Sequence, residues 1–111
     1  MIILKDKTKL EEIRTEHNHF FQKMVKIVVD IKENKLALNA ELHADLESLL
    51  LEEGSEQENL WGANIYFEGP VYVEFNSLIN IRPSQNNPSM DVLDENIQKD
   101  ILTIVDNWID K

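Results

Sequence analysis

Two groups of polar residues in this sequence could carry chemistry, and the first begins at Glu41. Glu41, His43 and Asp45 alternate with apolar residues just before a leucine-rich stretch. Carboxylates beside an imidazole can bind a divalent metal ion, or can act as an acid–base pair in which the carboxylate orients the ring. They can also be structural, because acidic side chains at a helix start interact favourably with the helix dipole. Such clusters are more often structural than functional.

The second group lies between residues 64 and 82 and includes Arg82, one of only two arginines. A guanidinium on a sheet face can hold a carboxylate or phosphate through two parallel hydrogen bonds. The favoured alternative is a salt bridge from Arg82 to Glu74 or Glu41. The polar residues that accompany Arg82 in this region are Asn64, Tyr66, Glu74, Asn76 and Asn80. If the two groups converge, the candidate ligand site consists of Glu41, His43, Asp45, Asn64, Asn80 and Arg82.

Composition removes several other kinds of chemistry. The sequence has no cysteine, which excludes disulfides and thiolate metal sites. Its three glycines lie far apart and it has no GxSxG motif, so neither a phosphate-binding glycine loop nor a nucleophile elbow is present. The net charge of −10 disfavours nucleic acid as a partner. The apolar runs are far shorter than the roughly 20 residues of a membrane span. We expect a cytoplasmic protein; the sequence identifies no cofactor and leaves open whether it is an enzyme.

Hydrophobic periodicity indicates the elements that position the first group. β-branched alternation over residues 25–31, followed by apolar positions in 36–40, predicts a hairpin that turns at Asn34. The leucines at 42, 46, 49 and 50 have helical spacing and predict a helix over 44–53, which ends before Gly54. Glu41 and His43 therefore lie where a strand passes into a helix.

The remaining periodicity predicts the rest of the fold. Alternation over 61–67 and 71–82 indicates a second hairpin, with a bulge near residues 76–77 because its second strand is long. Helices are expected over 9–22 and after Asp94, and a short strand at the N-terminus. The sequence predicts a single α+β domain over 1–111: a mostly antiparallel sheet, made of two hairpins and the N-terminal strand, with three helices packed over one face. The other face would carry the polar residues.

Two stretches of the sequence also resemble known motifs. ELHADLESLLLEEGSEQENLWGANIYF and SLINIRPSQNNPSM are similar to ELHADxExxLLxxGSxQxxLWGxNxY and INIRPxQxNRSM, the pattern of an uncharacterised family of small prokaryotic proteins, a domain of unknown function. The resemblance covers nearly the whole chain and implies no activity. The matching positions are Glu41, His43, Asp45, Glu47, Gly54, Ser55, Gln57, Trp61, Gly62, Asn64, Asn80, Arg82, Pro83, Gln85, Asn87, Ser89 and Met90.

The chain departs from that pattern in one loop. Pro88 stands where the family pattern has arginine, and Ser84 stands where a basic residue can occur. If the family binds an anion with this loop, the resemblance implies that this chain binds it weakly.

Two functions are consistent with these observations. The first is binding of a small ligand or a metal ion on the polar sheet face. The alternative is a protein-interaction or oligomerisation module without catalytic activity, which would use a strand edge, or Leu51 and the sheet face, to bind a protein partner or a second copy. Convergence of His43 with Asn80 or Arg82 in space would favour the first function.

Overall fold

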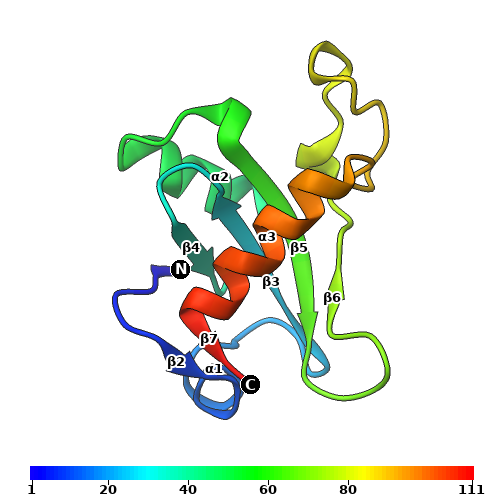
Figure 1. Ribbon diagram of the computed structural model, residues 1–111. Helices are drawn as coiled ribbons and strands as arrows, with labels where there is room; N and C mark the ends of the chain where they lie inside the picture. The colour runs from blue at the N-terminus through cyan, green and yellow to red at the C-terminus, as the bar shows by residue number, and fades with distance from the viewer.

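The protein is built around a five-stranded antiparallel sheet, seen in a computed structural model that describes residues 1–111 (Figure 1). The strands lie in the order β1 (Ile2–Ile3), β4 (Lys35–Leu38), β3 (Met24–Asp30), β5 (Leu60–Tyr66) and β6 (Val73–Glu74). The two expected hairpins, β3–β4 and β5–β6, and the short N-terminal strand are confirmed. Together with three helices they make the α+β fold that the sequence predicts.

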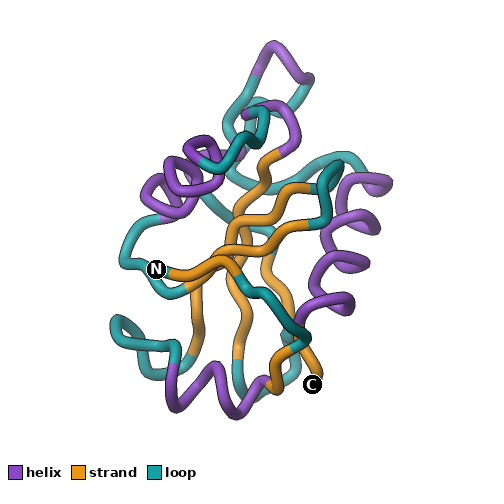
Figure 2. Tube along the Cα trace, turned by 90° about the vertical axis from the view of Figure 1, so that its left-hand side faces the viewer, coloured by secondary structure: helices purple, strands orange, loops and turns teal.

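Both faces of the sheet carry a hydrophobic core, because successive side chains of a strand point to opposite faces. Val25, Ile27 and Val29 belong to a core of 16 buried residues beneath α1 (Leu10–Glu16) and α3 (Glu95–Trp108). Val28 points the other way, into a core of 6 buried residues that includes Leu46 of α2 (His43–Glu52). Figure 2 shows the strands lying between α2 on one side and α3 on the other.

The expectation that all three helices cover one face is therefore wrong. Val28, Ala37 and Leu60 supply apolar positions on the face that was expected to be polar, and α2 packs on them. These apolar positions are few and lie between polar residues, so each strand looks half-polar when it is considered alone. Polar residues remain on this face beside the N-terminus of α2, where Lys26 and Asn64 lie opposite each other.

Two predicted elements are shorter in the structure. The helix expected over 9–22 is only α1, because Thr8 and Lys9 form strand β2 (Thr8–Lys9) and Asn18 turns the chain by donating to the carbonyl oxygen of Phe21. The strand expected over 71–82 is only β6. The chain then forms two 3₁₀ turns, η2 (Leu78–Asn80) and η3 (Pro83–Gln85); a third turn, η1 (Gln57–Asn59), precedes β5.

A second, two-stranded sheet joins segments near the two ends of the chain. β2 pairs in parallel with β7 (Ile109–Asp110), so that Thr8 lies opposite Ile109. Ile109 is 3% exposed and packs in the larger core. No helix of the structure combines the length and the apolar character that a membrane span requires.

Candidate functional site

A cleft of about 430 Å³ opens beside the N-terminus of α2, and we call it the α2 cleft. Its walls come from β3, the start of α2, β5 and the segment around η2. The residues that line it are Met24, Lys26, Leu42, His43, Ala44, Asn64, Asn76, Ser77, Leu78, Ile79 and Met90. Two larger surface hollows, of about 620 and 530 Å³, are lined mostly by polar and charged side chains and contain none of the six predicted site residues.

His43 is the first residue of α2, and its ring packs against β5. Nε2 lies 2.8 Å from the carbonyl oxygen of Ala63. Because a carbonyl oxygen only accepts, Nε2 carries the hydrogen, and Nδ1 holds a lone pair when the ring is neutral. Burial lowers the pKa of His43 below its usual 6.5, and the nearby Lys26 charge lowers it further, while the carbonyl of Ala63 and the neighbouring side chain of Asn64 favour the charged form. The ring is therefore neutral at pH 7.

Asn64 has a buried oxygen that no group donates to. The residue is 6% exposed, and its Nδ2 donates to a carboxylate oxygen of Glu74 at 2.9 Å. Its Oδ1 is buried without a hydrogen-bond partner. A buried acceptor left unpaired costs about 1–3 kcal/mol. Asn64 is one of the residues that line the α2 cleft.

Lys26 contributes a positively charged residue to the lining of the same cleft. It lies directly opposite Asn64 in the β3–β5 register, so the two side chains are neighbours on one face. Its Nζ lies 5.1 Å from the centre of the Phe21 ring and makes no ion pair with a carboxylate. With His43 neutral, Lys26 is the only charged side chain that lines the cleft.

Gly62 allows the neighbouring elements to close against β5. A Cβ atom at Gly62 would lie 2.6 Å from Cβ of Ser77 and 2.7 Å from its Oγ, and 3.2 Å from Cδ2 of His43. Real Cβ atoms essentially never approach other atoms within 3.0 Å, so the two distances to Ser77 exclude a side chain here. The absence of a side chain at Gly62 therefore allows both His43 and Ser77 to pack over this point of the strand.

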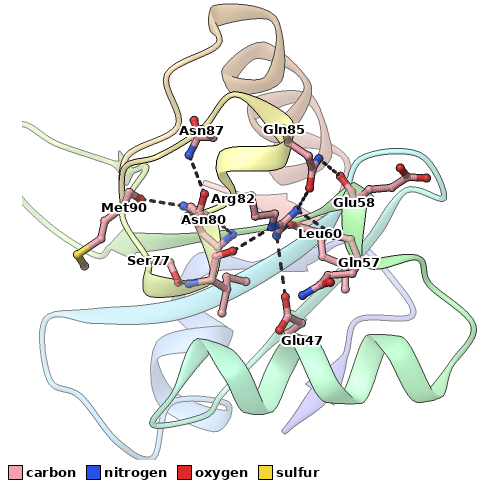
Figure 3. A network of polar contacts seen from close by, with 12 residues as sticks. Glu47, Gln57, Glu58, Leu60, Ser77, Asn80, Arg82, Gln85, Asn87 and Met90 are labelled. Carbon is pink, nitrogen blue, oxygen red and sulfur yellow. Dashed lines mark hydrogen bonds and ion pairs between the residues drawn. The ribbon is translucent and has the colours of Figure 1, made fainter.

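Asn80 occupies the edge of β5 in place of a neighbouring strand. Its Oδ1 accepts from the backbone nitrogen of Gly62 at 2.9 Å, and its Nδ2 donates to the carbonyl of the same residue at 3.0 Å. Nδ2 also donates to the carbonyl of Met90 at 3.1 Å (Figure 3). Asn87 then fixes the following loop by donating to the carbonyl of Asn80 at 2.7 Å. All of these contacts lie inside the protein.

Arg82 also uses its donors internally. The guanidinium donates to backbone carbonyls and to one side-chain oxygen, those of Gln57, Leu60, Ile79 and Gln85. The residue is 7% exposed. Arg82 therefore anchors η1, η2 and η3 to the start of β5 (Figure 3), and has few donors left for an external anion.

The charge of Arg82 is balanced by a residue that was not expected. Glu47 of α2 places a carboxylate oxygen 3.9 Å from the guanidinium, whereas Glu74 and Glu41 make no ion pair with it. On another side the guanidinium lies 4.6 Å from the centre of the Trp61 ring, within the range of a cation–π contact. Burial lowers the pKa of Arg82, and the attraction of Glu47 opposes that effect.

The six predicted residues thus separate into three places. His43 and Asn64 line the α2 cleft. Asn80 and Arg82 lie at the edge of β5 and make no hydrogen bond with His43. Glu41 and Asp45 are exposed. The structure contains no group of three or more His, Cys, Asp or Glu side chains that could hold a metal ion.

The sequence interpretation missed three residues of the site: Lys26, Gly62 and Ser77. Lys26 and Gly62 lie on strands that were identified, on the face that was expected to be polar. Their role depends on how β3 and β5 align in the sheet. These two strands are separated in the chain by β4 and α2, so the alignment cannot be read from the local sequence. The only available signal was the glycine of WGAN within an otherwise regular strand, since such a glycine often marks a close approach.

In a comparison with protein-family models, residues 2–108 match a family described as "Protein of unknown function (DUF5674)". No curated protein and no solved structure matches the chain.

Proposed function

Because the chain belongs to the DUF5674 family, whose description names no activity, we propose a function from the site itself: the domain binds a small molecule in the α2 cleft. The observation that carries this proposal is the buried Oδ1 of Asn64, which has no donor. Buried polar groups in folded proteins are nearly always hydrogen-bonded, so each exception needs an explanation. A ligand with an N–H or O–H group would supply the missing donor.

The shape and lining of the cleft support the same proposal. Ligand sites typically enclose a few hundred cubic ångströms and combine apolar walls with a few polar groups that orient the ligand. The α2 cleft has a volume of about 430 Å³. Its apolar walls come from Met24, Leu42, Leu78, Ile79 and Met90.

The methionines provide a direct test. The chain has three, of which Met24 and Met90 line the cleft and Met1 does not. A small-molecule library can be screened by NMR on protein that carries ¹³C-labelled methionine methyl groups. We expect a ligand to shift the methyl signals of Met24 and Met90 together, while the Met1 signal stays in place.

A matched pair of variants tests whether the cleft is the site. Ala44 lines the cleft and is exposed, so Ala44→Leu should fill it without disturbing a buried contact. Ser48→Leu adds the same side chain one turn further along α2, outside the cleft. We expect Ala44→Leu to abolish binding and Ser48→Leu to leave it intact. Equal binding to both variants would refute the proposed site.

The exposed apolar residues at the rim support a second candidate, self-association through the same surface. Leu78 is 71% exposed and Leu42 is 54% exposed, and Leu51 on the outer side of α2 is 39% exposed. If a second copy covers this surface, light scattering should show a dimer whose dissociation is promoted by Leu78→Asp. A monomer at all concentrations would remove this candidate.

Two expectations from the sequence stay predictions. A chain with a net charge of −10 should not bind nucleic acid. The absence of cysteine is consistent with a cytoplasmic location.

A further inference from the structure

We propose that the ligand of the α2 cleft is a small apolar carboxylate that carries an N–H or O–H donor next to the carboxylate. This inference rests on the proposed function of the cleft and specifies the class of molecule. It assigns the carboxylate to Lys26, the donor to Oδ1 of Asn64, and the apolar body to the walls of the cleft.

The charge of Lys26 favours an acidic ligand. Lys26 lines the cleft without an ion-pair partner, in a protein whose acidic residues outnumber its basic ones by 21 to 11. Glu74 contacts Asn64 but does not line the cleft. Its Oε1 already accepts from Asn64 and from the hydroxyl of Tyr66. A negative group on the ligand would find a positive partner in the cleft and no carboxylate in its wall.

The spacing of Lys26 and Asn64 allows a single head group to bind both. Lys26 and Asn64 are directly opposite in the β3–β5 register, and such pairs have Cβ atoms about 4.5–5.5 Å apart. One ligand head group can therefore reach both side chains at once. A carboxylate with an adjacent amide or hydroxyl has this arrangement of acceptor and donor, whereas an amine would meet Lys26 with like charge.

The apolar walls of the cleft favour a ligand with an apolar body. Leu42 and Ile79 line the cleft beside the two methionines, and methionine side chains adapt to ligands of different shape. An acyl chain or an aromatic ring of moderate size would bury apolar surface there. A fully polar acid would leave these walls in contact with water.

N-acetyl-L-phenylalanine has all three features and is the probe we would use. Its primary amide has the same size without the charge, and 3-phenylpropionate keeps the charge without the N–H. We expect the amide and 3-phenylpropionate each to bind about tenfold more weakly, as for the loss of one hydrogen bond. Binding is measured by the methyl shifts of Met24 and Met90.

A pair of lysine variants separates the specific charge from the net charge. Lys26→Gln should remove the preference for the acid over its amide. Lys32→Gln makes the same change in net charge at an exposed residue of the β3–β4 turn and should keep the preference. A peptide that ends in phenylalanine distinguishes a free acid from a chain terminus: tighter binding of the peptide would identify the terminus as the source of the carboxylate.

The outcomes separate this inference from the function on which it rests. If the acid and its amide bind equally and both shift Met24 and Met90, the charge assignment is overturned while the cleft remains a binding site. If the acid fails to bind but other library members shift these methyl groups, the ligand class is wrong. If no compound shifts them, both the class and the proposed function are refuted.

Discussion

At the scale of single residues, Gly62 sets how closely the parts of the site can pack. Alanine at this position would place its Cβ within 2.7 Å of both side-chain atoms of Ser77. We expect Gly62→Ala to lower the free energy of unfolding by about 1–3 kcal/mol, as overpacking does. Urea denaturation measures the loss. The double variant Gly62→Ala with Ser77→Gly should lose less unfolding free energy than the two single variants lose together. A loss equal to their sum would contradict the steric explanation.

His43 is the residue whose protonation should affect stability. Its pKa in the folded protein lies below 6.5 because the ring is buried, so the unfolded chain binds the proton more readily. The stabilisation is fully present above pH 6.5 and is lost as the pH falls through the folded-state pKa. We therefore expect the wild type to lose more stability than His43→Gln between pH 7.5 and pH 5, measured by thermal unfolding. Parallel curves for the two proteins would contradict this assignment.

The sequence predicted some of these residues and could not predict their partners. His43 and Asn64 were identified from their types and positions, and both line the α2 cleft. The pairing of Lys26 with Asn64 depends on a register between strands that are separated by a strand and a helix. No local pattern reports such a register, so the alternation over residues 25–31 can place Lys26 only on the polar side of a strand.

At the scale of elements, the segment after β6 pairs with β5 through a side chain and not through the backbone hydrogen bonds of a strand. Alternating apolar residues predicted a strand through Arg82, but Asn80 pairs with the backbone of Gly62 through its amide group instead. Hydrophobic periodicity misleads here, because the polar Asn80 and Arg82 are the buried side chains of this segment, whereas Leu78 and Ile81 are 71% and 43% exposed. By contrast, the helix after Asp94 was predicted well, since its apolar stripe is regular and Asp94 accepts from the backbone nitrogens of Asn96 and Ile97.

This arrangement gives a prediction for Asn80. Asn80→Ala would leave the nitrogen and carbonyl of Gly62 without their partners in a buried place. We expect a loss of about 2–4 kcal/mol in unfolding free energy, together with faster hydrogen exchange at the Gly62 amide. Asn76→Ala is the control, because Asn76 lies in the same segment and its side chain bonds to Asp91 in an exposed place. Equal losses in the two variants would refute the role of Asn80.

At the scale of the whole molecule, the two ends of the chain contribute to one core. Ile109 follows α3 directly and is buried in the cluster that includes Leu10 and Ile13 of α1. We expect Ile109→Ala to cost about 2–4 kcal/mol, as for other buried large-to-small changes. Asp110→Ala, at the exposed neighbouring position of β7, should be nearly neutral. Urea denaturation of both variants tests this, and an equally small loss at Ile109 would show that the end of the chain is not needed.

The β2–β7 pair also bears on the order in which the protein folds. Thr8 and Ile109 are about one hundred residues apart in the chain, and the entropic cost of closing a loop rises with its length. The β3–β4 hairpin, whose strands are four residues apart, can form locally and early. During synthesis β2 must wait for its partner until about one hundred further residues have been made. Until then Leu10 and Ile13 lack Ile109, and the larger core stays open on the side that the last residues cover.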